Sequence, residues 1–347
     1  MDKLIIASMR SGAGKTSIIV GMAKVLKKRV GYMKPFGDKL LYRKKRLWDY
    51  DAALMTNIFD LKDAPEDMSI GFDHSKLRYM YDEAGTRQRL MEAASHVGEG
   101  KDVLFVEGGK DITYGISVHL DSISLARHMG GKLFIVLSGD ADTVLDDVSF
   151  VKKHVDTADM GFGGVIINKV HDAEDFKRTY LDSIAQMGID VLGLIPYKTE
   201  LTHFSIDYLS ESLFAKVIAG EGALGRVVEN ILVGAMSADA VLRHPVFQKK
   251  NKLVITSGDR SDMILAALES DAVGVILTNN ILPPPNIVAM ASERNVPLLL
   301  VSTDTYQTAK QIETTEPLLT KGSTEKIALL EQLVREHVNY RSAPLKP

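Results

Sequence analysis

The sequence predicts an α/β protein in which helices cover both faces of a mostly parallel sheet, followed by a second, smaller α/β domain. Short apolar runs alternate with segments of helical spacing up to about residue 200, which is the rhythm of repeated β-α-β units. A second series of this kind begins near residue 226. The chain has 347 residues, more than one domain usually holds, so two domains are expected.

Composition excludes several classes of function. The formal net charge of -3 gives no electrostatic case for nucleic-acid binding. The absence of cysteine excludes disulfides and thiolate catalysis, and it fits a reducing cytoplasm. Because no apolar run approaches the ~18 residues that a membrane span needs, and the first run is too short for a signal peptide, we expect a soluble cytoplasmic protein with no membrane contact.

The first seventeen residues outline a phosphate-binding loop, or P-loop. The apolar run Leu4–Ala7 suits a central parallel strand, and the residues from Ser17 onward recur at helical spacing. Between these segments, Gly12 and Gly14 let the backbone approach a ligand closely. Backbone N–H groups and the positive end of the following helix can then face phosphate oxygens.

The next two side chains carry the chemistry of such a loop. Lys15 supplies a charge for the outer phosphates, and the Thr16 hydroxyl can ligate Mg²⁺. The usual pattern G-x-x-x-x-G-K-[ST] has glycine where this chain has Met9, so the match is partial. In the alternative interpretation, Gly-Lys-Thr only opens an ordinary helix. We expect ATP and Mg²⁺ to bind here, in contact with Ser11, Gly12, Ala13, Gly14, Lys15, Thr16 and Ser17.

Two other polar residues stand at the ends of predicted strands. Residues 29–35 read as a short strand that proline stops, which places Lys34 at its end. Residues 101–109 form an apolar strand that ends in Glu107 and two glycines. Ligands of open α/β sheets bind at strand ends, and an acid there can hold Mg²⁺ or its waters opposite the P-loop. The alternative for Glu107 is a cap on the next element.

The segment between these strands is polar. The basic run of Lys39, Arg43, Lys44, Lys45 and Arg46 is interpreted as a solvated face, with an anion site as the alternative. A helix is predicted around 52–58, a long loop or lid over 60–83, and a helix over 84–97.

The remaining elements define two domains, residues 1–205 and 215–340, with the boundary within residues 200–222, where Gly220 and Gly222 flank Glu221. Strands are predicted at 132–137, 164–168 and 190–195, then at 226–233, 252–256, 272–277 and 296–301, with helices between them and a last helix at 324–338.

With these residues in place, roughly residues 1–200 resemble the dethiobiotin synthetase and cobyrinic acid a,c-diamide synthase group of P-loop proteins. The phrase Ile-Ile-Ala-Ser-Met-Arg-Ser-Gly-Ala-Gly-Lys-Thr is similar to the group's altered loop, in which the first glycine is often missing. Lys34-Pro35 is similar to the Lys-Pro of dethiobiotin synthetases, whose lysine lies beside the transferred phosphate. The resemblance implies Mg²⁺ ligation by Glu107 and Asp51, and reading of the adenine edge by Asn168.

The resemblance also bears on assembly. Arg10 falls near the position where related ATPases of the MinD type carry a lysine that reaches across a dimer. A role of Arg10 in a partner subunit is one option, and we expect a homo-oligomer, namely a dimer.

The C-terminal part resembles the DRTGG domain, which follows such a P-loop-like domain in bacterial phosphate acetyltransferases. Gly258-Asp259-Arg260, Leu277–Asn280 and Val301–Thr305 occupy the corresponding places, with Thr-Asn-Asn where the domain's name has Thr-Gly-Gly. Asp259 and Arg260 either contact a ligand or form a helix cap and a local ion pair. The acetyltransferase catalytic domain has no place in these 347 residues, so acetyl transfer is not implied.

Two functions remain open. In the first, Lys15 and Lys34 are catalytic residues of an ATPase or ligase-like enzyme that activates a small carboxylate or amine by phosphoryl transfer. In the second, the chain is a nucleotide-responsive regulatory or sensor protein whose effector is a small molecule. The retained Lys34-Pro35 favours the enzyme.

Overall fold

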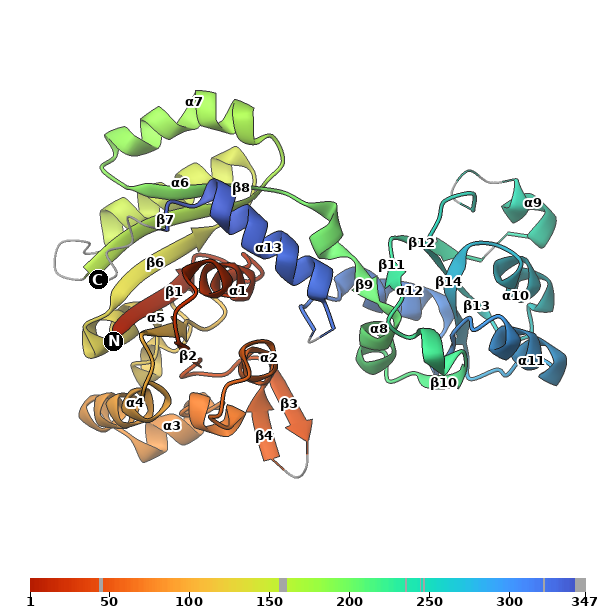
Figure 1. The fold of residues 1–347 in the computed structure, drawn as a ribbon, viewed down its shortest axis with the longest axis horizontal. Coiled ribbons are helices and arrows are strands. Elements are labelled where there is room, and N and C mark those ends of the chain that lie inside the picture. The colour runs from red at the N-terminus through yellow and green to blue at the C-terminus, as the bar shows by residue number, and fades with distance from the viewer. Residues whose placement is uncertain are drawn as a thin grey trace. The chain divides into compact units, whose positions relative to one another are not determined.

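The computed structural model of this chain describes residues 1–43, 46–155, 161–234, 236–243, 245, 247–320 and 322–340. Lys44 and Lys45 of the basic run lie outside the described residues. The chain divides into two compact units (Figure 1). One unit is Met1–Lys198 with Ser323–Pro347, and the other is Thr199–Gly322.

The first unit is built on a six-stranded sheet in which every neighbouring pair runs parallel. The strands at its centre are buried apolar runs, as expected where both faces are covered. In sheet order the strands are β2 (Val30–Met33), β5 (Val103–Glu107), β1 (Asp2–Ser8), β6 (Lys132–Leu137), β7 (Gly161–Val170) and β8 (Val191–Pro196).

Helices lie on both faces of this sheet. The helices of this unit are α1 (Lys15–Leu26), α2 (Tyr50–Phe59), α3 (His74–Met80), α4 (Glu83–Val97), α5 (Ser122–Met129), α6 (Ala141–His154), α7 (Ala173–Gln186) and α13 (Thr324–His337), with 3-10 turns η1 (Pro65–Met68) and η2 (Ile116–Val118). The connection through α1 runs toward the β2 edge, whereas those through α5, α6 and α7 run toward the β8 edge. Since parallel crossovers are right-handed, connections in opposite directions lie on opposite faces. The predicted fold class is confirmed.

Helix starts in this unit follow two patterns. Helices α2 to α7 begin at an aspartate whose carboxylate accepts from a first-turn backbone N–H, and these caps are Asp49, Asp73, Asp82, Asp121, Asp140 and Asp172. Helix α1 begins at Gly14 with no side-chain cap. Its first-turn N–H groups are therefore left for another acceptor.

Residues 60–83 are not the long loop that their polar composition predicts. They contain η1 and α3, and they are tied to the end of β2 by backbone hydrogen bonds from Lys34 N to Met68 O (2.9 Å) and from Gly37 N to Gly71 O (3.1 Å). Before them, the basic stretch forms a hairpin of β3 (Leu40–Arg43) and β4 (Arg46–Asp49). Contacts from distant residues, which local composition does not reveal, give this region its order.

The last helix belongs to the first unit, which corrects the predicted boundary of 215–340 for the second domain. Helix α13 packs against α1 (Figure 1), and Asn339 N donates to Leu192 O of β8 (2.7 Å). The close approach of the two helices depends on Gly21, which faces Leu330 and Val334. Periodicity along the chain predicts the helix but cannot say which sheet it covers.

The second unit, smaller than the first, has a five-stranded sheet with one antiparallel edge. In sheet order its strands are β10 (Lys216–Ala219), β15 (Leu298–Leu300), β14 (Ala272–Thr278), β13 (Lys252–Ser257) and β12 (Asn230–Val233), and a separate pair is formed by β9 (Phe204–Ser205) and β11 (Val227–Val228). Its helices are α8 (Ile206–Ser212), α9 (Ala238–Leu242), α10 (Ser261–Leu268), α11 (Pro285–Glu293) and α12 (Thr305–Thr314), with 3-10 turns η3 (Thr199–Thr202) and η4 (Glu221–Ala223).

Two apolar clusters hold this unit together. One cluster joins the sheet to α9, α10 and α11 through residues such as Val241, Met263 and Ile287. The other joins it to α8 and α12 through residues such as Leu209 and Ile312. The predicted second α/β region is thus confirmed.

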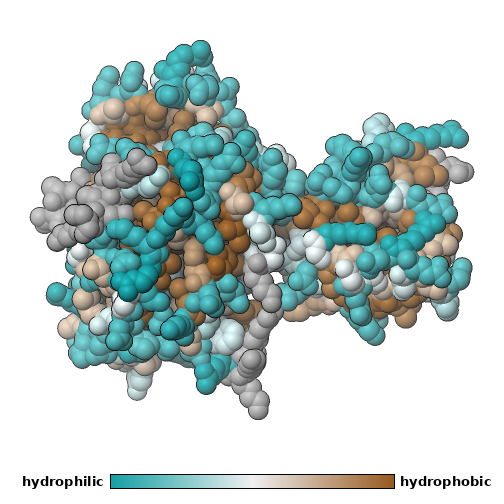
Figure 2. All heavy atoms as spheres, in the orientation of Figure 1, coloured by the Kyte–Doolittle hydropathy of each residue, from teal (hydrophilic) through white to brown (hydrophobic). Residues whose placement is uncertain are grey.

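Over the described part of the chain, every helix falls short of the length and apolarity that crossing a bilayer requires. Hydrophilic residues are spread over much of the face that Figure 2 shows, with hydrophobic residues visible between them.

Candidate nucleotide-binding site

The P-loop lies between the end of β1 and the start of α1. Gly12 and Gly14 have φ of 72° and 97°, backbone conformations that side chains with a Cβ rarely adopt. Helix α1 has no side-chain cap at Gly14, so its N-terminal N–H groups and its dipole are available to an anion. The loop therefore has the geometry predicted for it despite Met9. Ser11 and Gly12 are exposed, and Ser17 is half-buried in the first turn of the helix.

The end of β7 holds this loop in place. Asn168 Nδ2 donates to Ala13 O (2.9 Å), and Lys169 Nζ donates to Gly12 O (2.7 Å). A Cβ at Gly14 would lie 2.4 Å from Asn168 Nδ2, so the two groups are in close contact. The donor group of Asn168 is directed to the loop backbone, and reading of an adenine edge by this residue stays a prediction. Lys169 was missed, although it directly follows the predicted asparagine.

Lys15 is buried beside the end of β1. Its Nζ donates to Ser8 Oγ (2.8 Å) and to Lys110 O (3.2 Å). Burial lowers the pKa of Lys15 from its usual value. Both acceptors are uncharged, so the oxygen atoms of a phosphate would be stronger acceptors for this ammonium.

Glu107 lies opposite the first turn of α1. Thr16 Oγ1 donates to Glu107 Oε1 (2.9 Å), and Tyr32 Oη donates to Glu107 Oε2 (2.9 Å). Burial, and next the charge of Asp51, raise the pKa of Glu107 to about 7. Its oxygens accept from side-chain hydroxyls rather than from a first-turn backbone N–H, and metal ligation by Glu107 stays a prediction. A hydroxyl and a carboxylate oxygen fit the hard oxygen donors that Mg²⁺ takes.

Lys34 lies within a group of carboxylates and is 1% exposed. Its Nζ is 2.7 Å from Asp51 Oδ2 and 3.6 Å from Asp49 Oδ2, and it also pairs with Asp38. Burial alone would lower the pKa of Lys34, but the charges of Asp51 and Glu107, with those of the other two aspartates, raise it well above its usual value. The positive charge of Lys34 is therefore already balanced by carboxylates.

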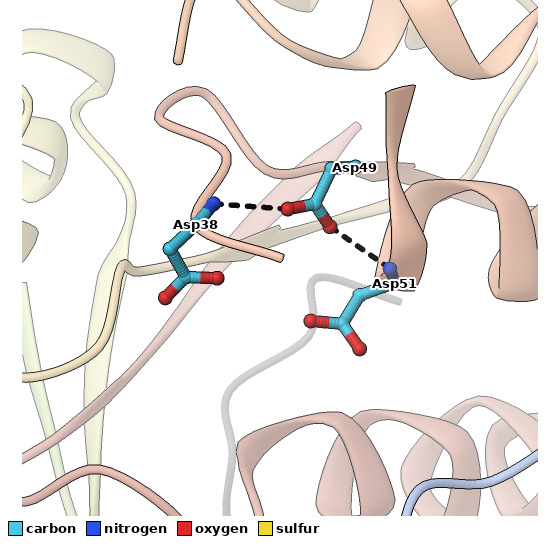
Figure 3. Close-up of side chains that lie close together, drawn as sticks. All are labelled: Asp38, Asp49 and Asp51. Atoms are coloured by element: carbon cyan, nitrogen blue, oxygen red, sulfur yellow. Dashed lines mark hydrogen bonds between the residues drawn. The ribbon is translucent and has the colours of Figure 1, made fainter. Parts of the chain in front are cut away.

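Among the three aspartates, Asp49 accepts hydrogen bonds from the backbone N atoms of the other two, as Figure 3 shows. Asp49 Oδ1 accepts from the backbone N of Asp51 (2.9 Å) and of Ala52 (3.4 Å). Asp49 Oδ2 accepts from the backbone N of Asp38 (3.0 Å) and of Lys39 (3.2 Å). A carboxylate has about four lone-pair sites, so Asp49 is occupied in capping α2 and holding the hairpin.

These contacts bear on metal binding. One oxygen from each of Asp38, Asp49 and Asp51 lies within 4.8 Å of the others, yet the Lys34 ammonium already contacts all three. Burial acts to raise the pKa of Asp51, but the charges of Lys34 and Lys39, together with the hydrogen bond from Lys34, lower it below its usual value. Metal ligation by Asp51 stays a prediction. Sequence reasoning missed Asp38 and Asp49, although Asp49 stands two residues before Asp51.

Arg10 is held within its own subunit. Its Nε and Nη2 atoms donate to the carboxylate of Asp147 on α6 (3.2 and 3.0 Å), which is a bidentate pair. The role of Arg10 across a dimer, and the dimer itself, stay predictions.

In the second unit, the motif residues lie at the carboxyl ends of the parallel strands. Arg260 pairs with Asp262 (3.1 Å) and donates to Met236 O (2.8 Å), so a local ion pair is formed, although its partner is not Asp259. Asn279 and Asn280 have φ of 60° and 53°. Asparagine tolerates this left-handed region better than most residues, so the two asparagines adopt a backbone conformation that glycine also allows.

The fold and the loop define a P-loop protein of the nucleotide-binding class. Residues 2–205 match the family described as an AAA domain, and residues 209–315 match the DRTGG domain. The first match covers more than half of the chain, so the chain belongs to this AAA-domain family, with a DRTGG domain after it. The predicted order of the two domains is confirmed, whereas the finer likeness to dethiobiotin synthetases stays a prediction.

The chain is similar over nearly its whole length to bacterial phosphate acetyltransferases. It is 24% identical to that of Synechocystis sp. over 96% of this chain, 22% identical to that of Nitratidesulfovibrio vulgaris over 97%, and 26% identical to that of Pseudomonas putida over 98%. The chain spans about half the length of these curated relatives, 50 to 51%.

Two solved structures overlap parts of the chain. One contains the CBS and DRTGG domains of the regulatory region of Clostridium perfringens pyrophosphatase with its activator diadenosine tetraphosphate, at 20% identity and a TM-score of 0.30 over 35% of this chain and 50% of that one. The other is a Cyanothece McdA variant in complex with ATP, at 15% identity and a TM-score of 0.34 over 58% of this chain and 85% of that one. At these TM-scores the likenesses carry no functional argument.

Proposed function

We propose that this chain binds ATP with Mg²⁺ at its P-loop and acts as a nucleotide-responsive regulatory protein. The observation that carries the proposal is the hydrogen bond of 2.9 Å between Thr16 Oγ1 and Glu107 Oε1, at the uncapped start of α1 and beside the buried Lys15. Thr16 and Glu107 would hold Mg²⁺ directly or through its waters, and the ion would neutralise charge on the outer phosphates. Lys15 would exchange its two neutral acceptors for phosphate oxygens.

Regulation is favoured over turnover by the contacts of Lys34. Phosphoryl transfer needs positive charge directed at the moving group, whereas the charge of Lys34 is balanced by Asp38 and Asp51. The match of this chain to half of the phosphate acetyltransferases, over a P-loop domain and a DRTGG domain, also supports a regulatory role.

Replacing Lys15 with alanine should weaken ATP binding by roughly 10- to 100-fold, since a charge-assisted hydrogen bond contributes about 1.5–3 kcal/mol. The fold should remain, because the lysine leaves behind only Ser8 Oγ and Lys110 O. Calorimetric titration with Mg²⁺ and ATP measures the effect. Lys62→Ala, which removes an exposed lysine from the same unit, is the control. Equal affinity in Lys15→Ala and wild type would rule out the P-loop as the binding site.

Glu107→Gln should reduce the gain in ATP affinity that Mg²⁺ provides, with little change in EDTA, because the substitution removes the ligand charge and keeps the shape. Metal binding needs the ionised carboxylate, and the pKa of Glu107 is raised to about 7. In wild type, the Mg²⁺-dependent rise in melting temperature at saturating ATP should therefore be larger at pH 8 than at pH 6. A Mg²⁺ effect that is unchanged in the variant contradicts the assignment.

The same substitution gives a test without ligand. The folded-state pKa of Glu107 (about 7) lies above its ordinary value of 4.5, so the unfolded chain loses this proton first as the pH rises. The contribution of Glu107 to stability is thus full below pH 4.5 and declines up to about pH 7. Relative to wild type, Glu107→Gln should be more stable at pH 8 than at pH 5 in chemical denaturation.

Phosphoryl transfer is the second candidate, because Lys34 follows the carboxyl end of β2 and the P-loop follows the carboxyl end of β1, on the same side of the parallel sheet. The two candidates differ in what ATP changes. A regulatory protein should show ATP-dependent hydrogen exchange across residues 256–306 and no turnover above the background rate. An enzyme should release ADP faster when a small carboxylate or amine is added, and that result would overturn the regulatory proposal.

A further inference from the structure

We infer that Tyr32 is a positioning residue, which holds the carboxylate of Glu107 so that one oxygen faces Thr16. This inference rests on the proposed binding of Mg²⁺ and ATP. Tyr32 lies on β2, the strand next to the one that ends in Glu107, and none of the motifs in the sequence pointed to it.

The register of the two strands brings the groups together. Tyr32 pairs with Phe105 in the parallel ladder between β2 and β5, and Glu107 follows two residues later on the same face. Tyr32 is 2% exposed, and its phenol oxygen is 2.9 Å from Glu107 Oε2. An ionised carboxylate only accepts hydrogen bonds, so the phenol is the donor.

The two oxygens of Glu107 are thereby given separate tasks. Oε2 is fixed to the sheet through Tyr32, and Oε1 accepts from Thr16 on the P-loop helix. Turning the carboxylate plane away from this orientation would break both contacts at once. The phenol thus fixes the plane of the carboxylate with one oxygen toward the helix, and it adds a hydrogen bond that favours the charged form that a cation requires.

Hydrogen-bond partners of metal ligands commonly change metal affinity by 10- to 100-fold when they are removed. A partner with a purely structural role behaves differently, since its loss lowers stability and leaves the metal effect intact. The ratio of ATP affinity in Mg²⁺ to that in EDTA separates these cases, because a general loss of native structure affects both affinities equally.

The experiment measures this ratio by calorimetry for wild type, Tyr32→Phe and Tyr208→Phe. The control removes the same atom from the second unit, where the Tyr208 phenol donates to Glu316 O (2.7 Å). We expect Tyr32→Phe to lower the ratio about tenfold, with less than a twofold change in EDTA, and Tyr208→Phe to leave the ratio unchanged. Titration of Mg²⁺ onto protein already saturated with ATP keeps a weakened variant folded, because the ligand stabilises the native state.

Two outcomes would overturn the inference in distinguishable ways. If wild type and the control keep a Mg²⁺-dependent gain and Tyr32→Phe keeps the same gain, Tyr32 is structural while the proposed function stands. If wild type itself shows no such gain, the proposed function fails and the inference fails with it.

A second check uses the double variant of Glu107→Gln and Tyr32→Phe. Once Glu107 is glutamine, adding Tyr32→Phe should not lower the ratio of ATP affinity in Mg²⁺ to that in EDTA any further. A full additional loss in the double variant would also contradict the inference.

Discussion

Lys34→Met should destabilise the first unit by roughly 3–5 kcal/mol, the usual effect of removing one partner from a buried ion pair. Methionine fills the space of the side chain but leaves Asp38, Asp49 and Asp51 without the cation they surround. The exposed fraction of the Lys34 side chain is only 2%, so water cannot replace it. The melting temperature should fall by about 10 °C.

A matched control is available in the second unit. Lys252 is also buried, at 2% exposure, but its Nζ lies over the Phe247 ring (4.8 Å) and donates to Lys249 O (3.2 Å). Burial lowers the pKa of Lys252, which is the opposite direction from Lys34. Lys252→Met should therefore change the free energy of unfolding far less. Equal losses in the two variants would show that the aspartates around Lys34 are not held by its charge.

Part of the stability lost in Lys34→Met should return when one of the surrounding carboxylates is also removed. In Lys34→Met with Asp38→Asn, one buried charge is lost and the amide keeps the size of the side chain, so stability should lie between that of wild type and that of the single variant.

This coupling also affects any test of phosphoryl transfer. Loss of activity in Lys34→Met would reflect unfolding as well as chemistry, so turnover is better compared in Lys34→Arg, which keeps the charge and changes its geometry.

The sequence predicts the residues of the site where a general rule places them. The chemistry of phosphate binding places glycines and Lys15 between a strand and a helix. The topology of open sheets places polar ligand-binding residues at the carboxyl ends of parallel strands. For this reason Thr16, Glu107 and Lys34 lie close to where they were expected.

The missed residues have side chains whose partners are distant in sequence. Tyr32 contacts Glu107 across 75 positions, and Lys169 contacts Gly12 across 157. A tyrosine in a buried strand and a lysine after a strand have no unusual local pattern, so only the strand order reveals their partners. Asp51 and Lys34 differ from these missed residues, because the sequence analysis does single them out. It gives each a role toward the nucleotide, whereas the structure pairs them with one another.

The same limit explains the domain boundary. The spacing predicts a helix over 324–338, and the structure has one from Thr324 to His337. Spacing defines which face of a helix is apolar, but it does not say which sheet that face covers. Because this helix directly follows the second αβ series in the sequence, it is assigned to the second domain. The packing of α13 on α1 depends on a single glycine in the middle of α1, where a sequence pattern gives no hint of a partner helix.

Gly21→Leu should therefore separate α13 from α1 and lower the stability of the first unit by several kcal/mol. A Cβ at Gly21 would lie 2.5 Å from Val334 Cγ2 and 2.8 Å from Leu330 O, and the second contact is with backbone, so the whole helix must move. Overpacking of this kind typically costs about 1–3 kcal/mol, and the loss of apolar contacts along α13 adds to it. In an exposed helix the same substitution would be stabilising by about 1 kcal/mol, because glycine is a poor helix former. The direction of the change in stability therefore distinguishes a packed Gly21 from an exposed one.

Hydrogen exchange should show residues 324–337 losing protection in Gly21→Leu. The control is Gly225→Leu, at a position where a Cβ meets nothing within 4 Å. It should leave both the exchange pattern and the melting temperature unchanged. A rise in melting temperature for Gly21→Leu would contradict the packing of the two helices.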